Sequence, residues 1–116
     1  MNRMRILLVD DDLLVLATLG AELKARGYEV LVASSGEEGV RVAREQSPDL
    51  VVMDVRMPRL TGPEALRMIR RLRPHVRAVL MTAYASGDFA AQTAGAEAPD
   101  VLHKPFEPTA LFSLIE

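Results

Sequence analysis

Acidic residues directly follow two apolar runs of this sequence. Asp10 and Asp11 come after Ile6–Val9, and Asp54 comes after Leu50–Met53. Carboxylates within about 4–6 Å of one another raise each other's pKa and repel, so such a cluster is costly unless a cation joins it. Carboxylate oxygens are hard ligands of the kind that Mg²⁺ prefers. If the fold brings these acids together, they form a candidate site for a divalent cation.

Two further polar residues follow apolar segments in the same way. Thr82 comes after Ala78–Met81, and Lys104 comes after Pro99–His103. A hydroxyl donor and a fixed positive charge, added to acids and a divalent cation, suit the binding of a phosphoryl group. The chain has no cysteine and no well-placed serine or histidine, so a carboxylate would be the nucleophile. Its attack on a phosphoryl donor would form an acyl phosphate.

The stretch from Leu50 to Pro58 predicts where Asp54 stands in the fold. Its unbroken apolar run is typical of a strand buried on both faces of a parallel sheet, and Pro58 cannot donate to a strand ladder. Asp54 would then stand at the carboxyl end of a central strand, the edge where open α/β sheets bind ligands. The alternative from this stretch alone is a loop residue that starts a turn. Asp12 lies where a helix begins, so we expect it to cap that helix rather than to bind metal.

The elements that must position these residues alternate regularly along the chain. Strands are expected over Ile6–Val9, Tyr28–Ala33, Leu50–Asp54, Ala78–Met81 and Pro99–His103. Helices are expected from about Val15 to a stop at Gly27, from Ser35 to about Gln46, from Thr61 to about Leu72, from Ser86 to about Ala96, and from Pro108 to Ile115. Capping boxes are expected at Ser35–Glu38 and Thr61–Glu64, and Leu66, Ile69 and Leu72 are expected to face inward.

This order predicts an α/β fold, a doubly wound parallel sheet of five strands covered by five helices. The carboxyl ends of parallel strands meet at one edge, so the polar residues named above would gather there. The length suits a single domain over residues 1–116. Because the last helix stops at Glu116, the chain could also be the N-terminal part of a longer protein.

Composition excludes several classes of function. The formal charge of −2 gives no reason to expect nucleic-acid binding by this domain, and the absence of cysteine excludes disulfides and thiolate metal sites. No apolar run approaches the ~18 residues of a membrane span, and no signal peptide precedes the first strand. We therefore expect a cytoplasmic protein.

The arginines of the third helix are expected to form a solvated face, and neither histidine has a partner at metal-ligand spacing.

Four short motifs together resemble the receiver domain of two-component response regulators, the flavodoxin-like family of the chemotaxis receiver. They are Val9-Asp10-Asp11, Met53-Asp54-Val55-Arg56-Met57-Pro58 with Gly62 four residues after the proline, Met81-Thr82-Ala83, and Lys104-Pro105-Phe106. Each motif alone is weak, but the four occur in order, at the family's spacing, over essentially the whole chain.

The resemblance implies a strand order of 2-1-3-4-5 and a role for each motif residue. Asp54 would accept the phosphoryl group, and Mg²⁺ would be held by Asp10, Asp11, Asp54 and the backbone carbonyl of Arg56. Thr82 and Lys104 would contact the phosphoryl oxygens, and the Lys104–Pro105 peptide would be cis. The donor would be a phosphohistidine on a sensor histidine kinase or a phosphotransfer protein. The resemblance implies no enzyme activity beyond the chain's own phosphorylation and dephosphorylation.

The sequence departs from the family at the position three before the lysine. The family usually has a ring there that turns inward on phosphorylation, and this chain has Val101. The Gly-Ala pair usual before the fifth strand reads Glu97-Ala98, and a Gly-Ala pair occurs two residues earlier, at Gly95-Ala96. These departures leave the phosphorylation chemistry intact and put the usual readout in doubt.

Two other functions remain open at this point. Asp10-Asp11-Asp12 after an apolar strand could belong to a haloacid-dehalogenase-type phosphatase. Leu14 stands where that motif has Thr or Val, and the phosphatase reading leaves the Asp54 motif unexplained. The chain could also be a degenerate receiver that acts only as a binding module. A nucleotide-binding Rossmann domain is disfavoured, because three acids replace its Gly-rich turn and would repel a pyrophosphate.

Overall fold

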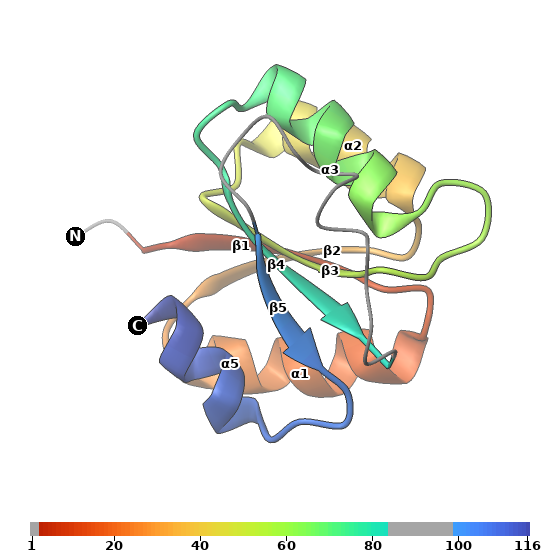
Figure 1. The fold of residues 1–116 in the computed structure, drawn as a ribbon. Coiled ribbons are helices and arrows are strands. Elements are labelled where there is room, and N and C mark those ends of the chain that lie inside the picture. Colours follow the sequence, from red (N-terminus) through yellow and green to blue (C-terminus); the bar gives the residue numbers. More distant parts are fainter. Residues whose placement is uncertain (1–2, 84–98) are drawn as a thin grey trace.

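The computed structural model describes residues 3–83 and 99–116 of the chain. Five parallel strands form one sheet in the order β2-β1-β3-β4-β5, as expected (Figure 1). The strands are β1 (Arg5–Val9), β2 (Glu29–Ala33), β3 (Leu50–Asp54), β4 (Arg77–Thr82) and β5 (Asp100–His103). The predicted doubly wound sheet is confirmed.

The described residues form four helices, where the sequence predicts five for the whole chain. They are α1 (Leu13–Ala25), α2 (Gly36–Gln46), α3 (Gly62–Leu72) and α5 (Pro108–Ile115). The helix expected from Ser86 to about Ala96 falls within residues 84–98, outside the described part of the chain. Figure 1 shows α1 and α5 on one face of the sheet and α2 and α3 on the other. No helix in the described part is long and apolar enough to cross a membrane.

The sheet separates two apolar cores, which explains the unbroken apolar runs. In β1, Ile6 and Leu8 pack into the core under α1 and α5, whereas Leu7 and Val9 pack into the core under α2 and α3. Because alternate side chains of a strand point to opposite faces, a strand covered on both sides must be apolar throughout. The edge strand β2 is less buried, and its Val32 is exposed.

Two helix starts behave as predicted and one differs in detail. The Asp12 carboxylate accepts a hydrogen bond from the Leu14 N–H at 2.9 Å, which makes it the N-cap of α1. Thr61 and Glu64 form the full capping box of α3. At α2, the Ser35 hydroxyl accepts from the Glu38 N–H, but the Glu38 carboxylate accepts from the N–H of Ser34, one residue before the cap. The predicted reciprocal bond to Ser35 is therefore shifted.

The inward face of α3 is narrower than predicted. Leu66 and Ile69 are fully buried, but Leu72 is 38% exposed, so the prediction that it faces inward is wrong. Six residues at about 100° each rotate Leu72 roughly 120° away from Leu66 around the helix. Residues spaced three apart therefore leave the buried face of the helix within two turns. The next residue, Arg73, donates hydrogen bonds to the Ala43 and Arg44 carbonyls of α2.

Candidate functional site

Parallel strand register brings the predicted site residues to one edge of the sheet. Val9 pairs with Met53, so Asp10 and Asp54 each follow a paired residue on neighbouring strands. Asp54 pairs with Met81 and Thr82 pairs with His103, which places Thr82 and Lys104 at the same end. The backbone N–H of Lys104 donates to the Thr82 carbonyl at 2.7 Å, and the Lys104–Pro105 peptide is cis, as predicted.

Three carboxylates meet at this edge. Asp10, Asp11 and Asp54 each offer an oxygen, and these oxygens lie within 4.8 Å of one another. Asp10 is completely buried, Asp54 is partly buried and Asp11 is exposed. The Asp12 carboxylate is not part of this group and caps α1 instead. One cation could therefore contact all three acids from the exposed side of the cluster.

The Lys104 ammonium lies among these carboxylates. Its nitrogen is 3.1 Å from the Asp10 carboxylate and 3.5 Å from that of Asp54. Burial lowers the pKa of Lys104, but the combined charges and hydrogen bonds of the two aspartates outweigh burial, so the pKa is raised overall. The lysine therefore stays charged and offsets part of the negative charge of the cluster.

The ionised form of Asp54 is unfavourable in this site even with Lys104 nearby. Burial, followed by the charge of Asp10, raises the pKa of the Asp54 carboxyl group. Lys104 and a hydrogen bond from the Arg56 backbone N–H act in the opposite direction but do not cancel the rise. A second cation close to these oxygens would favour the ionised form. The site thus offers carboxylate oxygens as ligands and an excess of negative charge, and both suit a divalent cation.

The loop after Asp54 is folded tightly against the strand it leaves. The Val55 N–H donates to the Met81 carbonyl, and the Gly62 N–H donates to the Val55 carbonyl, each at 2.9 Å. A side chain at Gly62 would overlap the backbone carbonyl of Asp54, which explains why glycine stands at this point of the motif. Sequence reasoning recognised Gly62 by its spacing and missed this contact, because only the folded loop brings the two backbones together.

The structure gives Arg56 a contact that the sequence analysis did not name. Its backbone N–H donates to the Asp54 carboxylate. The expected role of its carbonyl as a metal ligand stays a prediction. Thr82 is buried where β4 ends, and its contact with a phosphoryl oxygen also stays a prediction. A signal for the Arg56 bond was present, because aspartate side chains commonly accept a hydrogen bond from the backbone N–H two residues on.

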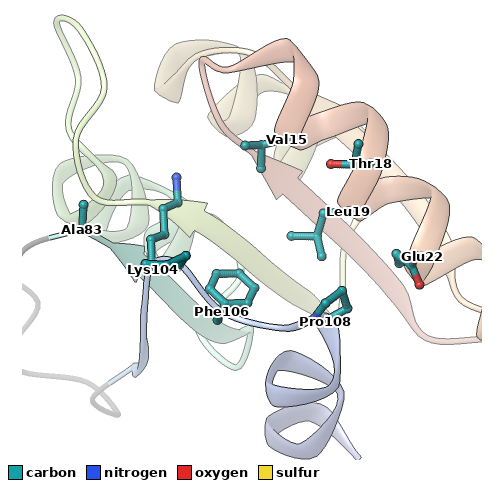
Figure 2. Close-up of a pocket in the computed structure, with 9 residues that line it drawn as sticks. Val15, Thr18, Leu19, Glu22, Ala83, Lys104, Phe106 and Pro108 are labelled. Carbon is teal, nitrogen blue, oxygen red and sulfur yellow. The ribbon is translucent and has the colours of Figure 1, made fainter.

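An apolar groove of about 540 Å³ opens beside Lys104, between α1 and the segment that follows β5. Val15 and Leu19 of α1 line one side, and Phe106 and Pro108 line the other (Figure 2). Figure 2 shows the Lys104 nitrogen directed away from Phe106 and Pro108, so the ammonium belongs to the carboxylate cluster and the lysine stem to the groove.

Comparison with known proteins agrees with this geometry. Residues 6–116 match the family described as the response regulator receiver domain. The chain is 40% identical over 102 residues to the transcriptional regulatory protein ZraR of Escherichia coli K12, covering 88% of this chain and 23% of that protein. It is 37% identical over 111 residues to the response regulator protein FleR of Pseudomonas aeruginosa, covering 96% and 24%. The chain spans about a quarter of the length of these two regulators.

Solved structures with the same fold include two receiver domains. The CheY-like receiver domain protein of Methanospirillum hungatei matches with a TM-score of 0.91 and 32% identity, covering 98% of this chain and 91% of the other. The receiver domain of the sensor histidine kinase PA1611 of Pseudomonas aeruginosa, solved with a magnesium ion coordinated in its active-site cleft, matches with a TM-score of 0.85 and 32% identity, covering 98% and 95%. The family match over nearly the whole chain, together with this fold, means that the protein belongs to the response regulator receiver domain family.

Proposed function

We propose that this receiver domain accepts a phosphoryl group on Asp54 in a Mg²⁺-dependent reaction and signals through the change that follows. The observation that carries the proposal is the convergence of Asp10, Asp11 and Asp54 within 4.8 Å, with the Lys104 ammonium 3.5 Å from Asp54. A partly buried carboxylate beside a lysine and two other acids is suited to attack a phosphoryl donor and to form an acyl phosphate. The donor would be a phosphohistidine of a sensor histidine kinase or a phosphotransfer protein.

Mg²⁺ fits the donor set of this site. Asp10, Asp11, Asp54 and the backbone carbonyl of Arg56 would supply oxygen ligands, and the magnesium in the related PA1611 receiver supports the choice of metal. When bound, the ion would offset the negative charge that builds up on the phosphoryl oxygens. Because Mg²⁺ keeps several waters and dehydrates reluctantly, we expect binding in the micromolar-to-millimolar range.

The protein's own groups would then hold and orient the phosphoryl group. Lys104 stays charged beside Asp54 and would contact one phosphoryl oxygen, and the Thr82 hydroxyl would contact another. The Arg56 N–H holds the Asp54 carboxylate in place before reaction. Chemistry would be limited to the domain's own phosphorylation and the hydrolysis of the product, and an output domain would act on the result in a protein of the length of its relatives.

The first turn of α1 would contact the donor protein. Leu13 and Leu14 directly follow the acidic run and are each 70% exposed. Large apolar side chains beside a reactive carboxylate are suited to being covered when a partner binds, because burial of apolar area drives association. The apolar groove lined by Val15 and Leu19 of α1 also reaches Lys104 and would add to this surface.

The test is labelling by a small acyl phosphate. Incubation with acetyl phosphate and Mg²⁺ should add one base-labile phosphoryl group, measured by intact mass, and peptide mapping should place it on Asp54. Asp54→Asn should abolish labelling, because an amide is not a nucleophile. Asp12→Asn is the matched control, since asparagine is an equally good N-cap and Asp12 lies outside the cluster.

Each other outcome selects a different function. If Asp54→Asn still labels on Asp10 and turns over rapidly, the domain works as a phosphatase. If neither acetyl phosphate nor phosphohistidine donors label the unaltered protein while Mg²⁺ binds, the domain is a binding module.

A further inference from the structure

The first turn of α2 approaches the loop between β3 and α3 more closely than any side chain would allow. A Cβ placed on Gly36 would lie 2.9 Å from the Leu60 carbonyl oxygen, 3.1 Å from its Cβ and 3.3 Å from its Cδ2. The nearest of these atoms belongs to the backbone, so it cannot rotate away as the end of a side chain can. A residue larger than glycine at position 36 would therefore have to push the chain at Leu60.

The loop is built so that a push at Leu60 reaches Asp54. Leu60 is two residues before Gly62, whose N–H bonds to the Val55 carbonyl and on which a Cβ would lie 2.3 Å from the Asp54 carbonyl oxygen. Between them, Thr61 is held by the capping box of α3. The segment from Leu60 to Gly62 cannot absorb such a push by moving on its own, because each of its residues is fixed by a backbone or capping hydrogen bond.

The same helix turn also contacts the other strand that carries a site carboxylate. A Cβ on Gly39 would lie 3.1 Å from Cγ2 of Val9, the residue directly before Asp10. Outside this contact, Glu37 and Arg59 form an ion pair at 3.3 Å between α2 and the loop. Their side chains are 49% and 78% exposed, so the pair adds little, and the close glycine packing carries the contact.

We propose that Gly36 is a positioning residue for the metal site. By leaving room for Leu60, it lets the loop after Asp54 close against α2 and keeps Asp54 and Arg56 where they share one cation with Asp10. The inference rests on the proposed Mg²⁺-dependent function and adds to it a residue on a different helix that touches no ligand. Residues outside the ligand set can change metal affinity by changing how the ligands are held.

The test is the Mg²⁺ dissociation constant, followed by amide chemical shifts at a temperature where every variant is folded. Gly36→Ala should weaken Mg²⁺ binding about tenfold, the lower end of what loss of a group that orients metal ligands typically costs. Before Mg²⁺ is added, the amide shifts of residues 54–62 should already differ from those of the unaltered protein. Stability should change little, because alanine favours a helix over glycine and works against the cost of the close contact.

Two other glycines provide matched controls. Gly20→Ala places a methyl group in α1, 4.0 Å from Val30 Cγ1, an ordinary contact, and should leave Mg²⁺ affinity unchanged. Gly27→Ala meets no atom within 4 Å but is strained at φ 96°, so it should lower stability without changing Mg²⁺ affinity. Together they separate an effect on the site from an effect on folding.

Leu60→Ala keeps the inference testable if Gly36→Ala does not fold. This substitution removes most of the side chain that packs against Gly36. It should also weaken Mg²⁺ binding, because the loop between β3 and α3 then loses its packing contact with α2. Unchanged Mg²⁺ affinity in Gly36→Ala, or in Leu60→Ala where only that variant folds, would overturn the inference. If the unaltered protein fails to bind Mg²⁺, the metal-dependent function fails first and Gly36 has no site to position.

Discussion

The ammonium nitrogen of Lys104 lies 3.1 Å from the carboxylate of Asp10, a residue 94 positions earlier in the chain and completely buried. A buried carboxylate without a cationic partner is strongly destabilising, so this pair ties the end of β1 to the segment after β5. The lysine side chain itself is 26% exposed, which leaves it able to respond to charge that arrives at the site. Lys104 is thus both a structural partner of Asp10 and a candidate contact for a phosphoryl oxygen.

Replacing Lys104 should therefore affect stability and metal affinity in opposite directions. Lys104→Met keeps the apolar stem but leaves Asp10 unpaired, and we expect a loss of about 2 kcal/mol, below the usual cost of breaking a fully buried pair because Lys104 is partly exposed. Urea unfolding without metal measures this loss. The same variant should bind Mg²⁺ more tightly, since a competing positive charge has left the cluster.

The pH dependence of this loss has a definite sign. The pKa of Lys104 is raised in the folded protein, so its stabilising contribution is fully present below the ordinary lysine pKa and is lost only as the pH rises through the raised value. The stability difference between Lys104→Met and the unaltered protein should therefore not shrink as the pH is raised from 7 to 9. A difference that disappears within that range would contradict the assigned pair.

Asp54 should respond to pH in the opposite sense to a salt-bridged aspartate. Burial and the charge of Asp10 raise its pKa, so the folded state binds a proton more tightly than the unfolded state. Stability should fall as the pH rises from the ordinary aspartate pKa through the raised value, and ionised Asp54 should destabilise the metal-free protein at neutral pH. Asp54→Asn should consequently be more stable than the unaltered protein at pH 7 without metal.

Two measurements check this interpretation of Asp54. Thermal unfolding at a series of pH values should show the advantage of Asp54→Asn shrinking as the pH is lowered through the raised pKa. Saturating Mg²⁺ should stabilise the unaltered protein more than the variant. Asp12→Asn, which alters a carboxylate outside the cluster, should show neither behaviour. An Asp54→Asn variant that is less stable at neutral pH would mean that the carboxylate is held favourably.

Gly62→Ala should damage the site more severely than any change in α2. The new methyl group would overlap the Asp54 carbonyl and press on the Val55 α-carbon, both of them backbone atoms. We expect a loss of stability of about 1–3 kcal/mol, typical of overpacking, and loss of labelling by acetyl phosphate. Circular dichroism and intact mass measure the two effects. If Gly62→Ala labels at the normal rate, the contact with Asp54 does not matter for the reaction.

The site could be predicted from the sequence to the extent that parallel topology determines it. Asp10 and Lys104 follow a strand and Asp54 ends one, and right-handed parallel connections bring such positions to one edge. Capping also depends on local spacing, so the roles of Asp12 and Thr61 were predictable. In both cases the signal is local: each site residue stands at the end of its own apolar strand, and each capping residue stands directly before its helix.

What the sequence could not show depends on contacts between distant segments. The close approach of Gly36 to Leu60 requires the positions of α2 and the β3–α3 loop together, and no local pattern encodes it. The Arg56 N–H bond to the Asp54 carboxylate, by contrast, joins residues two positions apart, and the tendency of aspartate to bond the backbone two residues on could have suggested it. The outward rotation of Leu72 follows from helix geometry and could have been predicted by a stricter use of the 3.6-residue period.

Val101 leads to a prediction about the response to phosphorylation. Its side chain is partly buried and packs against the core on the α2 and α3 side of the sheet, in a ladder position opposite Leu80. Valine is short and has one stiff torsion, so it cannot move between exposed and buried positions as a ring can. Phosphorylation of this chain therefore cannot be signalled by a side chain at position 101 that turns from an exposed to a buried position.

The charges of the sequence around Val101 argue against dimerisation through this segment on activation. Residues 83–102 contain no lysine or arginine, whereas Asp88, Glu97 and Asp100 are acidic. A two-fold symmetric interface places the same patch opposite itself, so like charges would meet. We expect that beryllofluoride, a phosphoryl mimic, does not drive dimerisation through this segment, as measured by sedimentation velocity with and without it. A tight dimer that forms only with beryllofluoride, and that Asp88→Asn or Asp100→Asn disrupts, would show that the acidic residues take part in an interface after all.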